Sequence, residues 1–186
     1  AWMQVQKAQL SLAGIADVGE TVWGNLLLSD TEQIAQYWVH ELTRAITLAQ
    51  GEESLHPYLD SLSESLAGMQ LLQTAAAEGW DAASQASHVA FPRFRPVKNC
   101  PVPLIQEEIK RIRNNCKDAA EDLSSRFENS SAALLQDMKL LHPAMIGLFD
   151  LVKEFSAAYD TLKTKRGLLD FSDLEHKTVT LLANSD

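Results

Sequence analysis

Apolar residues recur every three or four positions along most of this 186-residue chain, with polar residues between them. This spacing places the apolar side chains on one face of an α-helix. The strict apolar–polar alternation of a half-buried β-strand is almost absent. The sequence therefore predicts an all-α fold. An irregular multi-helix bundle is favoured over a helical solenoid because no internal repeat of fixed period stands out.

The first part of the chain is predicted to form a helical hairpin. Ser29 and Glu32 have the spacing of a capping box, so a helix is predicted to begin there and to end near Gly51. After the short link GEES, apolar residues between Leu55 and Ala76 follow a pattern close to a heptad seam. A link this short favours an antiparallel arrangement of the two helices.

A proline-rich segment follows the hairpin. Gly79 precedes a short helical stretch, and residues 91–103 (FPRFRPVKNCPVP) contain four prolines. Proline has no backbone N–H and its ring clashes with the preceding helical turn, so this segment cannot lie inside a helix. We expect an extended linker or lid.

Further helices are predicted after the linker. Apolar residues between Ile105 and Phe127 predict a helix of about seven turns that starts after Pro103. The dipeptide at residues 142–143 (His-Pro) is predicted to interrupt the next apolar pattern. A further helix then follows, and its end is expected at Gly167, where basic residues precede a glycine.

The segment LDFSDLEH, residues 169–176, reads as the start of the last helix. Asp170 is predicted to be its N-cap, and Asp173 falls at the third helical position, near the positive end of the helix dipole. Leu169 and Leu174 have the spacing of a hydrophobic staple. Taken alone, these residues predict a well-capped helix.

Composition and charge narrow the class of protein. Hydrophobic residues make up 46% and the formal charge is −9, which fits a folded domain and argues against a surface coated with phosphate-binding groups. The apolar runs are shorter than the roughly 20 residues of a membrane span, and the N-terminus does not resemble a signal peptide. We expect no membrane and a cytoplasmic location. Cys100 and Cys116 lack CxxC companions, so buried or idle thiols are expected.

Motifs for catalysis are missing from the sequence. It contains no glycine-rich phosphate loop, no GxSxG and no HExxH. Asp173 and His176 have the spacing of a carboxylate-bridged metal helix, but the second such motif and the two further glutamates of that site are not visible. No catalytic residue and no metal ligand is predicted.

The stretch LLDFSDLEHKTVTLL also resembles the (L)DFxDLEH signature of AddA-type helicase-nuclease subunits, a branch of the UvrD-like superfamily 1 helicases. The signature residues are Leu169, Asp170, Phe171, Asp173 and Leu174. Residues 142–167 and 91–123 are similar to the stretches that lead up to it in the family. Residues 1–90 fit by helix pattern only.

The resemblance implies that residues 1–166 are the helical accessory subdomain called 1B. Residues 167–186 would be the helix that returns to the first RecA-like motor domain, which is itself absent. The family's ATP-binding lysine, Walker B carboxylates, arginine finger and nuclease carboxylates have no matching positions, so this chain alone should be inactive. ATP and Mg²⁺ belong to the implied parent.

The implied parent is an ATP-dependent DNA helicase and exonuclease. By the resemblance, it acts in double-strand break repair and recombination, pairs with an AddB-type subunit, and works in the bacterial cytoplasm. The role implied for the present chain is to bind DNA and position it for the motor.

Basic charge is concentrated where such a role would need it. Residues 91–117 hold seven basic and two acidic residues, whereas the segments before and after are net acidic. Lys110, Arg113 and Lys117 fall within about 60° on a helical wheel, and Phe91 or Phe94 is available for stacking or packing. Such a stripe can follow phosphates. The DNA-binding residues predicted are Arg93, Arg95, Lys98, Lys110, Arg113 and Lys117.

The alternative is a freestanding helical protein-interaction module without a nucleic acid ligand. In that case the basic stripe is a solvated helix face, because Glu107 with Arg111 and Lys117 with Glu121 have the i,i+4 spacing of ordinary ion pairs.

Overall fold

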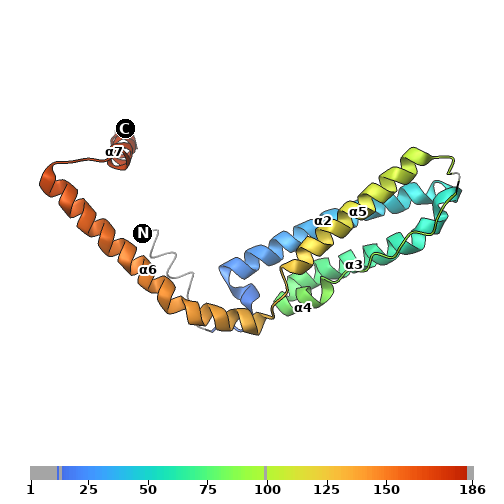
Figure 1. Ribbon diagram of the computed structural model, residues 1–186, viewed down its shortest axis with the longest axis horizontal. Helices are drawn as coiled ribbons and strands as arrows, with labels where there is room; N and C mark the ends of the chain where they lie inside the picture. Colours follow the sequence, from blue (N-terminus) through green and yellow to red (C-terminus); the bar gives the residue numbers. More distant parts are fainter. Residues whose placement is uncertain (1–11, 13, 99, 184–186) are drawn as a thin grey trace. The chain divides into compact units, whose positions relative to one another are not determined.

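The computed structural model describes residues 12, 14–98 and 100–183 (Figure 1). Their elements, in chain order, are η1 (Val18–Glu20), α2 (Val22–Gln50), η2 (Glu53–Tyr58), α3 (Leu59–Glu78), α4 (Trp80–Ala86), α5 (Pro103–Ser125), α6 (Ser131–Arg166) and α7 (Phe171–Ala183). No strand occurs among the described residues, which confirms the all-α prediction. The chain divides into two compact units, with the boundary between residues 139 and 140.

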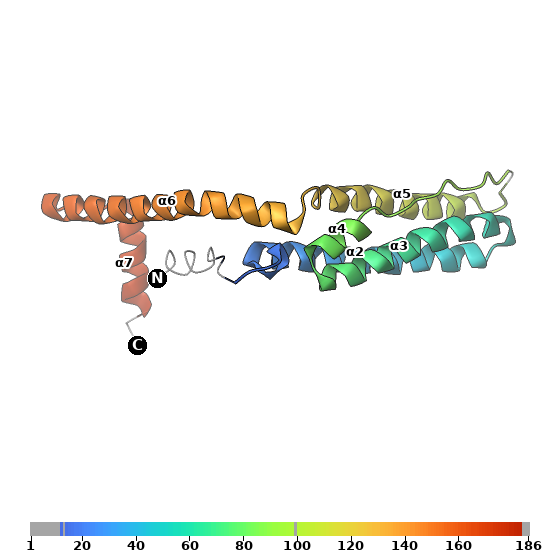
Figure 2. The ribbon, with the colours of Figure 1, turned by 90° about the horizontal axis from the view of Figure 1, so that it is seen from below.

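Helices α2, α3 and α5 form the core of the first unit. The predicted hairpin is confirmed: α2 and α3 lie side by side and antiparallel, and α5 packs along them (Figures 1 and 2). Their facing side chains are fully buried, among them Leu42, Leu62, Met69, Leu72, Ile109, Ile112, Cys116 and Leu123. Burial raises the pKa of the Cys116 thiol to about 12, so this cysteine is a packing residue, as expected.

The start predicted for the first helix is wrong. Helix α2 begins at Val22, and its N-cap is Thr21, whose hydroxyl oxygen accepts a hydrogen bond from the Gly24 N–H at 3.0 Å. Ser29 lies inside the helix. The additional turns were hidden because Trp23 and Leu26 are exposed, so the first residues of α2 do not follow the buried apolar pattern. The helix ends at Gly51, as predicted.

Gly79 marks the end of α3 and the start of α4. Its φ of +146° is a conformation that residues with a Cβ rarely adopt, so the chain turns here. The turn brings Trp80 into a second buried cluster, where its indole N–H donates to the Asn129 carbonyl at 2.9 Å. The short helix predicted after Gly79 is confirmed.

Helix α6 is continuous through Pro143, so the predicted interruption is wrong. Proline removes one backbone donor, but its fixed φ is compatible with helical backbone, and a helix of 36 residues retains its other hydrogen bonds. The predicted end is confirmed. Gly167 has a φ of +62°, and the Leu168 N–H donates to the Lys163 carbonyl at 3.0 Å, the bond that closes a Schellman motif.

None of the described helices is long and apolar enough to cross a membrane.

Candidate nucleic-acid interface

The proline-rich linker, residues 88–102, runs antiparallel to α3 and beside α5 (Figures 1 and 2). Its backbone is held by side chains. The Ser65 hydroxyl donates to the Ala90 carbonyl at 3.1 Å, and the Ser61 hydroxyl donates to the Arg93 carbonyl at 3.4 Å. Because an extended segment rich in proline cannot use its own backbone donors, these contacts fix its course along the bundle.

Arg113 of α5 holds the linker from the other side. Its Nη2 donates to the Phe91 carbonyl at 2.6 Å and to the Pro92 carbonyl at 3.0 Å. The guanidinium carbon lies 5.8 Å and 5.5 Å from the ring centroids of Phe91 and Phe94, within reach of a cation–π interaction. Arg113 was predicted to face DNA, and the structure engages its guanidinium with the linker.

The two linker phenylalanines pack rather than project. The ring of Phe94 stacks on Tyr58, with a centroid separation of 4.1 Å and an interplanar angle of 12°. The Tyr58 hydroxyl accepts a hydrogen bond from the Gln106 side chain at 2.8 Å, which ties the ring to α5. Of the two alternatives for Phe91 and Phe94, packing is the one that the structure shows.

Three basic side chains of the linker are exposed. Within the part of the chain that the structure describes, Arg93 and Lys98 donate to no side chain and form no ion pair. Arg95 lies 3.7 Å from the carboxylate of Asp60, but both side chains are more than 70% exposed, so this pair is loose. These three residues form the exposed basic rim of the linker.

Lys110 and Lys117 lie on the exposed side of α5, and each has an acidic neighbour on the same helix. Lys110 lies 2.8 Å from Glu107, and Lys117 lies 3.2 Å from Glu121. The hydrogen bond from Lys110 to Glu107 raises the pKa of Lys110. The predicted stripe is present, but its charge is partly neutralised within the helix.

A network that the sequence did not reveal joins α2 to α5. Arg44 donates to Glu41 at 2.7 Å and to Glu108 at 2.9 Å, and Arg111 donates to Glu108 at 2.8 Å. Hydrogen bonds from Arg111 and Arg44 lower the pKa of Glu108 to about 2. Arg111 therefore pairs with Glu108, not with Glu107. The one available signal was Arg44, an isolated base among the acidic residues of the first helices.

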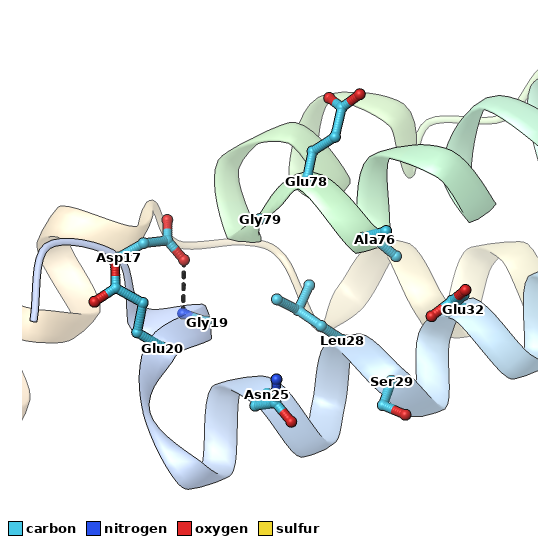
Figure 3. A pocket seen from close by; sticks show the side chains of 11 residues that line it. Asp17, Gly19, Glu20, Asn25, Leu28, Ser29, Glu32, Ala76, Glu78 and Gly79 are labelled. Atoms are coloured by element: carbon cyan, nitrogen blue, oxygen red, sulfur yellow. Dashed lines mark hydrogen bonds between the residues drawn. The ribbon is translucent and has the colours of Figure 1, made fainter.

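The opposite end of the bundle is acidic. A cavity of about 480 Å³ lies between η1, α2 and the end of α3, and the carboxylates of Asp17, Glu20, Glu32 and Glu78 are among the side chains that line it (Figure 3). The Asp17 carboxylate accepts a hydrogen bond from the Gly19 N–H at 2.6 Å. Among the described residues, no group of three or more His, Cys, Asp and Glu is placed to hold a metal ion. The cavity therefore contrasts in charge with the linker.

The signature segment forms a corner between α6 and α7. Asp170 caps α7: its carboxylate accepts from the Asp173 N–H at 2.9 Å, and the Asp173 carboxylate accepts from the Asp170 N–H at 3.0 Å. The ammonium of Lys163 donates to Asp173 at 2.7 Å and to Asp170 at 3.0 Å. These interactions lower the pKa of both carboxyl groups and raise the pKa of Lys163.

The apolar members of the signature point away from this corner. Phe171 is 87% exposed, and Leu169 and Leu174 are each about half exposed. The segment thus separates into two acidic residues that build the corner and three apolar residues that remain accessible. Sequence reasoning identified the cap but missed Lys163, which lies seven residues before Asp170 on another helix.

Comparison with known proteins identifies relatives over nearly the whole chain. An ATP-dependent helicase/nuclease subunit of the AddA type from Clostridium novyi is 28% identical over 99% of the chain. Proteins of the same name from Alkaliphilus metalliredigens and Clostridium beijerinckii are 30% identical over 98% and 26% identical over 100%. The chain is homologous to one segment of these helicase/nuclease subunits.

This relationship confirms the resemblance to AddA-type helicase/nuclease subunits that the sequence indicated. The chain spans about 15% of the length of the relatives that it matches. No family model matches the sequence.

Proposed function

We propose that the chain is a DNA-binding accessory segment of an ATP-dependent helicase/nuclease subunit, and that it positions DNA for a motor encoded elsewhere in that subunit. Residues 1–166 would form the 1B-like subdomain and residues 167–186 the helix that returns to the motor. The observation that carries the proposal is the exposed basic rim, Arg93, Arg95 and Lys98, on a linker fixed to a folded bundle.

The geometry suits binding to a phosphate backbone. Arg113 and the two serines of α3 hold the linker in place, so the rim does not have to be ordered when DNA binds. Lys110 and Lys117 extend the basic surface along α5. Because exposed ion pairs contribute only about 0–1 kcal/mol, a phosphate can replace Glu107 or Glu121 as their partner at small cost.

The activity of the whole subunit is part of this proposal. The relatives are named ATP-dependent helicase/nuclease subunits. We infer a parent that hydrolyses ATP with Mg²⁺, unwinds and degrades DNA during double-strand break repair and recombination, and works with an AddB-type subunit in the bacterial cytoplasm. No residue of this chain is assigned to ATP or Mg²⁺, and the chain would contribute DNA contacts only.

The test is a salt titration of DNA binding by the full-length subunit. Substituting Arg93, Arg95 and Lys98 together by Gln removes the rim and leaves the contacts of Arg113 intact. We expect weaker binding at low salt and a plot of log affinity against log salt that is flatter by about one unit for each phosphate that the variant no longer neutralises. Fluorescence anisotropy with a labelled oligonucleotide measures both quantities.

A matched control is available in the same chain. Lys153, Lys165 and Lys177 are also exposed, and replacing these three by Gln changes the net charge equally. This variant should bind DNA with the salt dependence of the unsubstituted protein. If the rim variant also kept that salt dependence, the rim would be a solvated surface and the proposal would be wrong.

A further inference from the structure

Helix α6 carries a seam of exposed apolar residues along its second half. The seam residues are Leu141, Met145, Leu148, Val152, Phe155, Tyr159 and Leu162, and each is between 38% and 67% exposed. Successive members are separated by alternating steps of four and three residues. This is a heptad spacing, which aligns the side chains along one line of the helix and is the pattern of a surface that packs against other elements.

The seam has no cover within the described structure. None of the described residues from 140 to 183 is buried, so this part of the chain has no core of its own. An isolated helix in water is marginally stable, and most helical stability comes from tertiary packing of an apolar face. A contiguous apolar surface of this kind on a folded protein marks an interface.

The flanks of the seam show what kind of surface it meets. In two-stranded coiled coils the flanking positions are commonly charged and pair across the interface. Here they include Ala144, Leu151, Ser156 and Ala158. The charged residues of this stretch lie on the opposite face, so an arc of about 160° is free of charge at 100° per residue. A face this wide fits a packed core formed with several elements better than a single paired helix.

We propose that the α6 seam is the docking surface for the remainder of the same helicase/nuclease subunit. The chain spans about 15% of its relatives, so most of each relative's length is available to cover the seam. The absence of charged flanks argues against a coiled-coil dimer of this chain. The inference rests on the proposed place of the chain within a longer protein, but it does not require that the basic rim binds DNA.

The experiment measures the accessibility of single cysteines in the full-length subunit without DNA. Leu148→Cys and Phe155→Cys place thiols on the seam, and Lys153→Cys and Glu154→Cys place matched thiols on the polar face of the same turns. The rate of maleimide modification in native protein is divided by the rate in denaturant, and modified peptides are quantified by mass spectrometry. We expect the seam thiols to be protected by at least about tenfold relative to the polar-face thiols.

A second measurement needs no substitution. Amide hydrogen exchange of residues 141–162 should be at least about tenfold slower in the full-length subunit than in the chain alone. Seam thiols that react as fast as polar-face thiols, or equal exchange in both proteins, would overturn the proposal. Protection that appears only after the partner subunit is added, or that depends on the concentration of the chain alone, would identify a different occupant and would also overturn it.

These outcomes are independent of the salt titration. A protected seam without the expected salt dependence would leave the docking surface in place and remove the interface assigned to the linker. An accessible seam with the expected salt dependence would do the reverse.

Discussion

The two compact units of this chain have the same amphipathic helix pattern but differ in what the pattern buries. In residues 12–139, the apolar faces of α2, α3 and α5 meet one another, and Leu42, Leu62 and Ile109 are fully buried. In residues 140–183, a seam of equally regular spacing stays exposed. Periodicity therefore reports that a face is suited to packing, but the position of its partner in the sequence is a separate question.

The largest effect that distinguishes the two units should come from truncating apolar side chains. Leu62→Ala removes a fully buried side chain and should lower the free energy of unfolding of the chain by about 2–5 kcal/mol. Phe155→Ala, at a position that is 67% exposed, should change it by less than about 0.5 kcal/mol. Denaturant titration followed by circular dichroism measures both. Comparable losses for the two variants would mean that residues 140–183 have a core of their own.

The next effect concerns Arg113 and the linker. Arg113→Met removes hydrogen bonds from a charged group to two carbonyls, and should lower the free energy of unfolding by about 1.5–3 kcal/mol. Lys117→Met is the control, because its exposed pair with Glu121 should be worth less than about 1 kcal/mol. Limited proteolysis should cut the linker faster in the Arg113 variant only. A stable variant with an uncut linker would show that the serines of α3 are sufficient to hold it.

A smaller and local effect is expected at the α6–α7 corner. Asp170→Ala removes the N-cap of α7, so amide exchange in the first turn of α7 should accelerate by about fivefold. Exchange in α2, α3 and α5 should not change, because these helices belong to the other unit. Asp170→Asn preserves a capping oxygen and should show a weaker effect. Faster exchange throughout the chain would contradict the separation into two units.

The smallest effect is a pH dependence in the first unit. The pKa of Glu108 is about 2 in the folded chain, below its ordinary value of 4.5, so its carboxylate stabilises the fold above about pH 4.5. This contribution is lost as the pH falls from about 4.5 to 2. Glu108→Gln should therefore make the unfolding midpoint less sensitive to pH in that range, whereas Glu64→Gln, an exposed site, should not. Parallel pH profiles for Glu108→Gln and the unsubstituted chain would exclude a role for the network.

Features set by neighbouring residues could be predicted from the sequence. The end of α2 at Gly51, the end of α6 at Gly167 and the cap at Asp170 follow from local backbone chemistry. The start of α2 at Val22 could not be predicted, because its first apolar residues face solvent and do not follow the pattern of a buried face.

The candidate site was predictable in location but not in detail. The concentration of basic charge in residues 91–117 is a property of the sequence, and the exposed rim lies within it. The role of Arg113 depends on contacts with Phe91 and Pro92, more than twenty residues away, and no local pattern reports such contacts. The same is true of Arg44 and Glu108, which meet only because α2 packs on α5.

The α6–α7 corner has a consequence for the order of folding. Its contacts join residues at most ten positions apart, from Lys163 to Asp173, and loops of about ten residues close in 10–100 ns. The corner can therefore form as soon as the ribosome releases this stretch, without waiting for a distant part of the chain. Helix α7 would then leave α6 in a fixed direction before the surface that covers the seam has folded. Docking would join preformed pieces, and the entropic cost of ordering this turn would already have been met locally.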